Sequence, residues 1–366
     1  MEVRGIISVL LVAALMSGCS RSTIDEVERD PSIAFRVDMP EAKSLIAPSN
    51  INTPGNRMKV YDVHTRTSPT EADQSGAGLF QYLDGQYLEC TDGGGNWSFV
   101  DEEDKVIDIP WTKRGTHSFF AHNTYDASAD QNLPGDVTVT YLSFEYDPAL
   151  YPTEKDQHLS LSSWTITPEN QFDFIYSSAE RDVMTSTDPA VRYAPVQMSF
   201  SHLFASVVFR VLVTSSETVT LTSFHLDNMY DEGVAKISFN GNVSLDLNQG
   251  DTNDAFYRNN LTEQIKTGES FLVHAGRGKI GIDGAFLIWP HSRAQFADVS
   301  MSISYKLGSS AEIHTVQGKL NELFVVNNWA AGSRYTYTIT IADEYVVYDV
   351  VEVVDWINND VEIEER

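Results

Sequence analysis

Cysteine and basic residues are both scarce in this sequence. The 366 residues include only two cysteines, Cys19 and Cys90, which excludes a framework of disulfide bonds and leaves a hydrophobic core to stabilise the chain. Lys and Arg number 25 against 52 Asp and Glu, which gives a formal net charge of -27 at pH 7. Nucleic acid and anionic lipid both attract basic surfaces, so this balance argues against either as a partner held by charge.

Long apolar runs are missing too. A helix needs about 20 apolar residues to span a bilayer, and the run Ile6–Met16, interrupted only by Ser8, is too short. It has the length of the hydrophobic region of a signal peptide, and the small residues Ser17-Gly18 follow it. We therefore expect residues 1–18 to be a signal peptide that is removed on export.

The stretch Ser17-Gly18-Cys19 resembles the lipobox of bacterial lipoproteins. In that class the cysteine thiol receives a diacylglyceryl group, the chain is cut just before the cysteine, and the new amine is acylated. The resemblance implies that Cys19 is the first residue of the exported protein and its lipid anchor, because two or three acyl chains hold a protein stably on a membrane. Ser20 at the next position implies the outer membrane. The alternative is an ordinary secretory signal, in which Cys19 has no special role.

Sequence patterns typical of catalysis or metal binding are absent. The chain has no G-x-S-x-G elbow, no H-E-x-x-H and no paired C-x-x-C, and its nine His residues show no metal-ligand spacing. His117 and His122 are an odd number of residues apart, so on one strand they face opposite ways. The acidic stretch Val100–Val106, VDEEDKV, lacks the ligand alternation of a calcium loop and is better explained as a solvated hairpin tip. We expect a protein with no enzymatic activity, no metal and no cofactor.

The sequence does contain β-strand pattern almost throughout. Apolar and polar residues alternate in Tyr335–Ile341, YTYTITI, and Ser206–Val213, SVVFRVLV, is typical of a more deeply buried strand. Loops rich in Asp, Gly, Asn and Ser separate such segments, and helical periodicity is scarce. Many short strands with frequent turns predict an all-β fold of the sandwich type. We expect Trp111, Trp289 and Trp329, which adjoin apolar strand residues, to lie in its core.

Changes in composition divide the expected fold. Residues 19–31 are polar and are predicted to form a tether, and a polar stretch flanked by Pro189 and Pro195 marks a boundary. We therefore predict two β-sandwich domains, over residues 32–188 and 189–366.

Five segments, taken together and in order, resemble the fimbrillin family, the subunits of fimbriae on anaerobic gut and oral Gram-negative bacteria. They are QFDFIYSSAERDVM, VQMSFSHLFASVVFRV, GAFLIWPHSR, WAAGSRYTYTITI and VVDWINND. The resemblance implies two tandem transthyretin-like β-sandwich domains after the lipoprotein signal. It also implies a fimbrial, or pilus, subunit with a structural or adhesive role. Its partners would be other fimbrial subunits, the outer membrane through the lipid, and a ligand on a host or bacterial surface.

The resemblance also implies a route of assembly. Family precursors reach the outer membrane as lipoproteins, and a trypsin-like protease then cuts after a basic residue and removes the lipid together with the first strand. The exposed groove accepts a strand from the next subunit. Such donor-strand exchange is a form of β-augmentation, in which backbone hydrogen bonds give affinity and side-chain pockets give register. Because the contact is head-to-tail it does not close, and it builds a filament.

The sequence offers parts for this assembly near its beginning. Ser32–Met39, SIAFRVDM, alternates apolar residues on one face, as a removable first strand should. Lys43 and Arg57 are candidate cleavage sites in the loop-like stretch that follows, and Lys43 better matches the position that the resemblance implies. The alternative is that both are ordinary loop charges and that the first strand stays in place.

The C-terminal end offers a candidate donor strand within residues 345–364. The stretch EYVVYDVVEVVDW is long, apolar and strongly β-prone, and such an edge invites pairing with another strand. The candidate donor residues are Val346, Val350, Val354, Trp356, Val361 and Ile363. The alternative is that this segment is the final strand of the second domain, followed by an acidic tail.

A function of a different class also fits the sequence. A monomeric surface lipoprotein could bind a glycan or a host ligand through aromatic residues on exposed loops, and the chain has six Trp and 16 Tyr. Aromatic residues fill a sandwich core equally well. Polymerisation after proteolysis distinguishes the two functions.

Overall fold

The computed structural model describes most of the chain after Pro31. The described residues are 31–38, 54–66, 78–92, 95–111, 115–123, 125–126, 131–132, 142–146, 149, 157–165, 174–183, 187–248, 256–259, 261–273 and 285–355. Strands dominate these residues, and the helices among them have four residues each: α3 (Pro189–Arg192), α4 (Arg293–Phe296) and α5 (Leu320–Leu323). None of these helices is long and apolar enough to cross a membrane.

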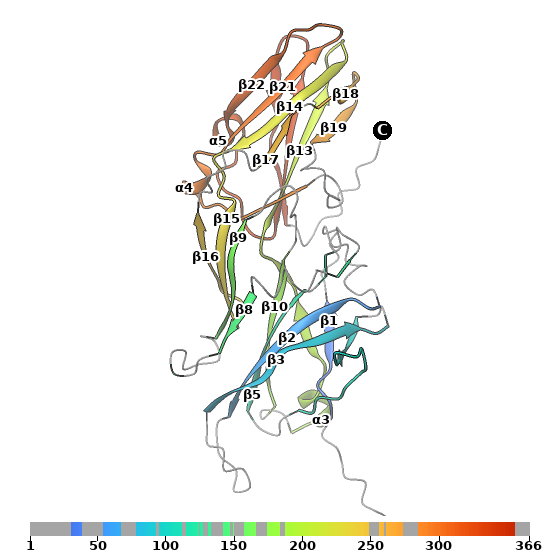
Figure 1. Ribbon diagram of the computed structural model, residues 1–366, viewed down its shortest axis with the longest axis vertical. Coiled ribbons are helices and arrows are strands. Elements are labelled where there is room, and N and C mark those ends of the chain that lie inside the picture. The colour runs from blue at the N-terminus through green and yellow to red at the C-terminus, as the bar shows by residue number, and fades with distance from the viewer. Residues whose placement is uncertain are drawn as a thin grey trace, which may run out of the picture.

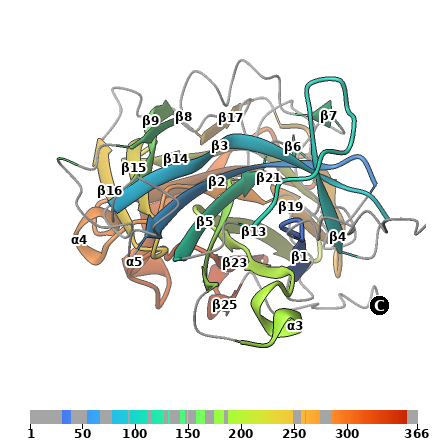
Figure 2. The ribbon, with the colours of Figure 1, turned by 90° about the horizontal axis from the view of Figure 1, so that it is seen from below.

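Eight strands form a single sheet at one end of the elongated molecule, drawn at the bottom of Figure 1 and seen from below in Figure 2. In sheet order they are β11 (Val196–Ser199), β1 (Phe35–Asp38), β4 (Asn96–Val100), β3 (Gly78–Cys90), β2 (Arg57–Arg66), β5 (Thr116–Asn123), β10 (Ile175–Asp182) and β12 (Ser201–His202). Neighbouring strands are antiparallel except β1 and β11, which are parallel. The sheet curls until its ends approach each other, where Arg181 Nη2 donates to Pro195 O at 3.2 Å.

The curled sheet encloses the first of two hydrophobic cores. Because successive side chains of a strand point to opposite faces, one face of each strand can fill this interior. Strands β1 to β5, β10 and β11 all contribute, among them Phe35 from β1, Phe99 from β4 and Phe119 from β5. Trp111 joins the same core and is only 2% exposed.

A four-stranded sheet covers the outer face of the eight-stranded sheet. It consists of β16 (Val243–Asn248), β15 (Glu232–Ser238), β9 (His158–Thr165) and β8 (Leu142–Glu145), and it lies between the two ends of the molecule in Figure 1. Phe144 of β8 packs on Tyr61, and Phe239, next to β15, packs on Phe120, with ring centroids 4.9 and 5.7 Å apart. A separate hairpin joins β6 (Tyr125–Asp126) to β7 (Gln131–Asn132).

Two further sheets face each other at the opposite end as a β-sandwich. One has β19 (Ser270–Val273), β13 (Ala205–Val213), β23 (Ser333–Ile341) and β24 (Val346–Tyr348), with β20 (Phe286–Ile288) paired to β13 and β25 (Glu352–Asp355) paired to β23. The other has β17 (Phe256–Asn259), β14 (Val219–Asp227), β21 (Ser300–Leu307) and β22 (His314–Lys319), with β18 (Gln264–Ile265) paired to β14. Between them Phe209 contacts Phe224 and Tyr337, each at 4.9 Å between ring centroids.

The predicted all-β fold with two sandwich-type units is confirmed. The alternating Tyr335–Ile341 lies within β23 and the apolar Ser206–Val213 within β13, as expected. Trp289 and Trp329 are at most 1% exposed and Trp111 is 2% exposed, which confirms that all three lie in the core. The acidic stretch 100–106 forms the expected hairpin tip, closed by a bridge between Val100 and Val106.

Strand pairing crosses the predicted domain boundary between residues 188 and 189 in two of the sheets. Strands β11 and β12 follow this boundary and pair with β1 and β10, because Val196 and Met198 fill the same core as Phe35. Strand β15 comes from the second half of the chain and pairs with β9 from the first. The four-stranded sheet therefore belongs to both halves. Residues 1–18 and nearly all of the tether 19–31 lie outside the described residues, so these divisions stay predictions.

Candidate functional site

The first strand, β1, occupies a well-defined seat in the eight-stranded sheet. Alternating apolar side chains of β1 and of the residues just before it are buried: Ile33, Phe35 and Val37 are 4%, 2% and 3% exposed. Arg36, between them, points outward and is exposed. The alternation of apolar and more polar residues in this part of the sequence therefore corresponds to side chains that point in turn into the core and into solvent.

Aromatic contacts hold the centre of β1. The Phe35 ring meets Phe99 and Phe119 edge to face, with centroids 5.5 and 5.2 Å apart and interplanar angles of 88° and 87°. Such pairs add about 0.5–1.5 kcal/mol each beyond the burial of their surface. Phe35 is therefore the main side-chain anchor of the strand.

Backbone hydrogen bonds join β1 to both of its neighbours. Phe35 lies opposite Val196 in the parallel pair with β11 and opposite Trp97 in the antiparallel pair with β4. Val196 N donates to Ala34 O at 2.8 Å. Because β1 alone separates β11 from β4, its loss would leave two unpaired strand edges and the apolar side chains that Phe35 now contacts. We call this place between β4 and β11 the β1 seat.

A short surface segment, residues 107–111, holds the start of β1 in the seat. Ile33 N donates to Ile109 O at 2.8 Å, and Trp111 N donates to Pro31 O at 3.1 Å. Ser32 Oγ donates to Asp108 Oδ1 at 3.0 Å. This cover segment lies at the surface, with Asp108 exposed to solvent and Trp111 buried.

The structure places Arg57, one candidate cleavage residue, at the start of β2. Arg57 lies opposite Glu89 in the pair with β3, and its side chain, 23% exposed, forms ion pairs with Glu89 at 2.7 Å and with Asp104. The hydrogen bond to Asp104 raises the pKa of Arg57. Proteases cut most readily in exposed loop tips, so these contacts disfavour cleavage after Arg57. Lys43, the other candidate, lies outside the described residues.

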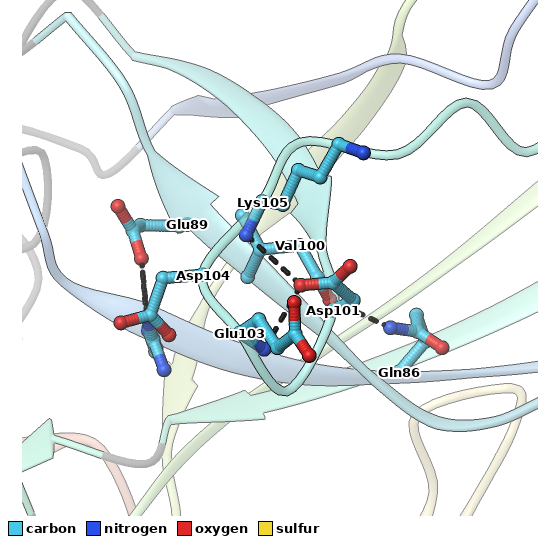
Figure 3. Close-up of polar contacts among 8 residues, drawn as sticks. Gln86, Glu89, Val100, Asp101, Glu103, Asp104 and Lys105 are labelled. Carbon is cyan, nitrogen blue, oxygen red and sulfur yellow. Dashed lines mark hydrogen bonds and ion pairs between the residues drawn. The ribbon is translucent and has the colours of Figure 1, made fainter.

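The ion pair of Arg57 with Asp104 depends on the hairpin tip that follows β4. Asp101 shapes this tip by accepting hydrogen bonds from Glu103 N and Lys105 N, both at 2.9 Å, and Gln86 Nε2 donates to Val100 O at 2.8 Å (Figure 3). Asp104 takes a left-handed φ of 66° at the turn, which places its carboxylate next to Arg57. The acidic residues of the tip thus serve the turn and the ion pair.

The described part of the candidate donor segment forms the edge of the six-stranded sheet. Val346 in β24 lies opposite Ile341, and Val354 in β25 lies opposite Arg334, both on β23. Val350, between these strands, is 83% exposed. This is the arrangement of a final strand of the second sandwich. Trp356, Val361 and Ile363 lie outside the described residues, and the donor assignment stays a prediction.

Sequence reasoning missed a buried cluster beside the β1 seat. Asp62 from β2 and His117 from β5 form an ion pair, with Oδ2 and Nδ1 2.5 Å apart and both side chains fully buried. The His64 ring stacks on His117 with centroids 4.4 Å apart. Burial raises the pKa of Asp62. The only signal in the sequence is that Asp62 and His64 are two residues apart on one strand, which gives no hint of His117.

Two other expectations concern single residues. As predicted, His117 and His122 face opposite ways: His117 packs on Trp111 in the inner core, whereas His122 stacks on Tyr61 on the outer face. Cys90 is buried and forms no disulfide within the described residues, and Cys19 lies outside them. Within the described part of the chain, no group of three or more His, Cys, Asp or Glu side chains is placed to hold a metal ion.

Comparison with known proteins gives a family match over most of the chain. The sequence matches the fimbrillin-like family over residues 48–356. No curated protein matches it. Among solved structures it resembles a fimbrial protein from Bacteroides vulgatus, with 12% identity over 89% of this chain and 100% of that one and a TM-score of 0.49. It also resembles a fimbrial assembly protein from Parabacteroides distasonis, with 11% identity over 88% and 97% and a TM-score of 0.40. A third is the fimbrial anchor protein Mfa2 from Porphyromonas gingivalis, with 11% identity over 89% and 98% and a TM-score of 0.35.

Proposed function

The chain belongs to the fimbrillin-like family of structural, non-enzymatic fimbrial proteins, and we propose that it is a subunit assembled by donor-strand exchange at the β1 seat. In this proposal the precursor is exported as an outer-membrane lipoprotein anchored through Cys19. Release of β1 then opens the seat to a strand from the next subunit. The fibre grows head-to-tail from other fimbrial subunits.

The observation that carries the proposal is the position of β1. A four-residue strand near the start of the described chain lies between two strands that are not paired with each other, with its apolar side chains Phe35 and Val37, and Ile33 just before it, in the core. A strand of this kind can be replaced by another that offers backbone groups and apolar side chains at alternate positions. The parallel pairing with β11 also supports exchange, because parallel pairs are slightly less stable per residue than antiparallel ones.

Cleavage after Lys43 fits this release better than cleavage after Arg57. Lys43 follows the last residue of β1, Asp38, and precedes the first residue of β2. A cut there separates β1 and the lipid from the rest of the chain and breaks none of the strands that the structure describes. A cut after Arg57 requires the end of β2 to open and two ion pairs to break.

The donor in this proposal comes from residues 345–364 of the next subunit. Val361 and Ile363 alternate with Asp360, Glu362 and Glu364, so an inserted tail would direct its apolar side chains into the seat and its carboxylates to solvent. Outward-facing charge of this kind protects a strand from pairing with the wrong partner before assembly.

The experiment uses the exported protein from residue 20 onward, treated with trypsin. We expect a new N-terminus after Lys43, followed by SDS-resistant ladders. Lys43→Gln should remain uncut between β1 and β2 and stay monomeric, whereas Arg57→Gln, the matched control, should be cut there and polymerise like wild type. A chain that ends at Asp355 should be cut but form no ladders. Ladders from Lys43→Gln with a new N-terminus at Met58, or a stable monomer after clean cleavage at Lys43, would overturn the proposal.

A further inference from the structure

A surface pocket of about 480 Å³ lies on the second sandwich, beside its last described strand. Its wall comes from α4, from α5 and the loop that follows it, and from Tyr335 of β23 and Val353 of β25. Tyr335 and Val353 lie directly opposite each other in the strand register, and β25 ends two residues later at Asp355. The last 11 residues of the chain, 356–366, therefore start three residues beyond the wall of this α4–α5 pocket, and we call them the C-terminal tail.

Four polar side chains line the α4–α5 pocket, namely Arg293, Asn321, Asn327 and Asn328. Within the part of the chain that the structure describes, none of the four side chains forms a hydrogen bond or an ion pair. An asparagine amide both donates and accepts hydrogen bonds, which suits the backbone of an extended peptide. A guanidinium suits a carboxylate. The pocket therefore offers the groups that an acidic, extended peptide can bind.

Apolar side chains of the pocket are left uncovered. Val325, on the loop after α5, is 90% exposed, and Val353 is 50% exposed. Deeper in the pocket, Phe324 and Tyr335 are each 3% exposed. Exposed apolar surface at a hollow is typical of a place that another apolar group covers. A matching occupant therefore carries apolar as well as acidic side chains.

The C-terminal tail has this composition and sufficient length. Four of the seven residues 360–366 are acidic. The apolar residues of the tail are Trp356, Ile357, Val361 and Ile363. Among the described residues that line the pocket, Arg293 alone is charged, in a chain whose formal net charge is -27. Five residues of extended chain span about 17 Å, so the acidic positions can reach across the pocket from Asp355.

We propose that the α4–α5 pocket binds the C-terminal tail of the same subunit, with tail carboxylates on Arg293 and the tail backbone on the asparagine amides. The inference rests on the proposed function in one respect, namely that the tail is the donor for the next subunit. The pocket then stores the donor on its own sandwich until an open β1 seat competes for it.

Docking within one chain needs only weak contacts. An exposed ion pair contributes little by itself. The tail is tethered at Asp355, however, and a short tether gives an effective concentration on the order of millimolar. The β1 seat offers backbone hydrogen bonds on two sides and a core for the inserted side chains, so it binds the tail more tightly than the pocket does. The pocket therefore keeps the tail from wrong partners without preventing assembly.

The test traps the docked tail as a disulfide in the full exported chain, from residue 20 onward. Val325→Cys is combined with Val361→Cys, and the dilute protein is oxidised with oxidised glutathione. The closed monomer is counted by mass spectrometry after free thiols are blocked. The matched control combines Val350→Cys with Val361→Cys, because Val350 is 83% exposed, lies close to the tail in the chain and does not line the pocket. Closure should be about tenfold faster at Val325, because docking raises the local concentration of one thiol at the other.

A charge swap tests the role of Arg293. Arg293→Glu should reduce closure at Val325 to the rate at Val350, whereas Lys266→Glu, an exposed cation outside the pocket, should leave it unchanged. Replacing all four acidic residues of the tail by Lys should restore fast closure in Arg293→Glu. Equal closure at Val325 and Val350, or no effect of Arg293→Glu, overturns the inference. A disulfide-linked dimer in place of the closed monomer also overturns it, since the occupant is then the tail of a second copy.

The assembly assay separates this inference from the proposed function. After trypsin treatment, the closed monomer should form no ladders until its disulfide is reduced. Ladders from wild type, together with equal closure at Val325 and Val350, overturn the pocket alone. Selective closure at Val325, when wild type forms no ladders, overturns donor-strand exchange and supports the pocket as the binding site of the tail. Ladders from the closed monomer without reduction overturn the storage of the donor.

Discussion

Truncation of Phe35 gives the sharpest prediction for the β1 seat. In a subunit cut after Lys43, β1 is held without a covalent bond, and its retention depends on three buried apolar side chains and the hydrogen bonds to β4 and β11. Phe35 is 2% exposed and contacts Phe99 and Phe119 edge to face. Replacing a buried Phe by Ala costs about 3–5 kcal/mol in transfer and cavity energy. At about 1.4 kcal/mol per factor of ten, the cut strand should bind about two to three and a half orders of magnitude more weakly in Phe35→Ala.

The assay follows the released N-terminal peptide. The protein is cut at pH 7.5, separated from free peptide by size exclusion, and sampled over time by mass spectrometry for loss of the segment that ends at Lys43. The wild-type complex should hold its peptide for much longer than Phe35→Ala does. Before cutting, the variant should still fold, because its chain remains joined to β2.

The matched control is Phe224→Ala in the second sandwich. Phe224 is fully buried and contacts Phe209 at 4.9 Å, so the substitution should lower the free energy of unfolding by a similar amount without touching the seat. Its cut form should keep the N-terminal peptide as wild type does. Equal release from both variants, or wild-type retention in Phe35→Ala, would refute the assignment of Phe35 as the anchor of a removable strand.

Two further predictions concern stability. Burial lowers the pKa of His122 to about 4 from an ordinary 6.5. Between these pH values the unfolded state is protonated at His122 and the folded state is not, so the free energy of unfolding falls as pH drops from 6.5 towards 4. The ring of His122→Phe can still stack on Tyr61 and Phe174. Between pH 7 and pH 4.5, the free energy of unfolding measured in urea should therefore fall by about 2–3 kcal/mol less in this variant than in wild type. An equal fall in both proteins would contradict a buried neutral imidazole at His122. Asp343 accepts hydrogen bonds from Ser215 Oγ at 2.7 Å and Ser216 N at 2.8 Å, which lower its pKa. Asp343→Asn should thus lower the urea midpoint at pH 7 but have little effect below the lowered pKa, where the wild-type carboxyl is already protonated; equal effects at both pH values would show that its charge has no role.

The strands themselves could be predicted from the sequence because their cause is local. Alternation of apolar and polar residues over Tyr335–Ile341 is enough to place β23, and a continuous apolar run is enough to place β13. The inward face of β1 is visible for the same reason, since Ile33, Phe35 and Val37 alternate with more polar neighbours. Alternation with a period of two residues indicates which face of a strand is buried, and it does so whichever strand is the partner.

The partners of the strands could not be predicted in the same way. Strand β11 pairs with β1 across more than 150 residues of sequence, and nothing near Val196 distinguishes that partner from β10, its neighbour in the chain. For the same reason a change of composition near Pro189 marks a loop but not the end of a sheet. The ion pair of Asp62 with His117 depends on the register of β2 against β5, which local pattern does not specify. The contact of Arg57 with Asp104 depends on a turn that lies 47 residues further along the chain.

The pairing of β24 and β25 bears on which residues can act as a donor. Both strands hydrogen-bond to β23, so their use as a donor would break the pairs that Ile341 makes with Val346 and Arg334 with Val354. Each lost backbone hydrogen bond costs about 0.5–1.5 kcal/mol net, and the seat of another subunit would first have to compensate for these losses. Val361 and Ile363 offer two apolar side chains at alternate positions beyond Asp355, and their use as a donor would leave the pairs of β24 and β25 with β23 unbroken. The energetics therefore favour a donor that begins after β25 and leaves the second sandwich intact while it binds the next subunit.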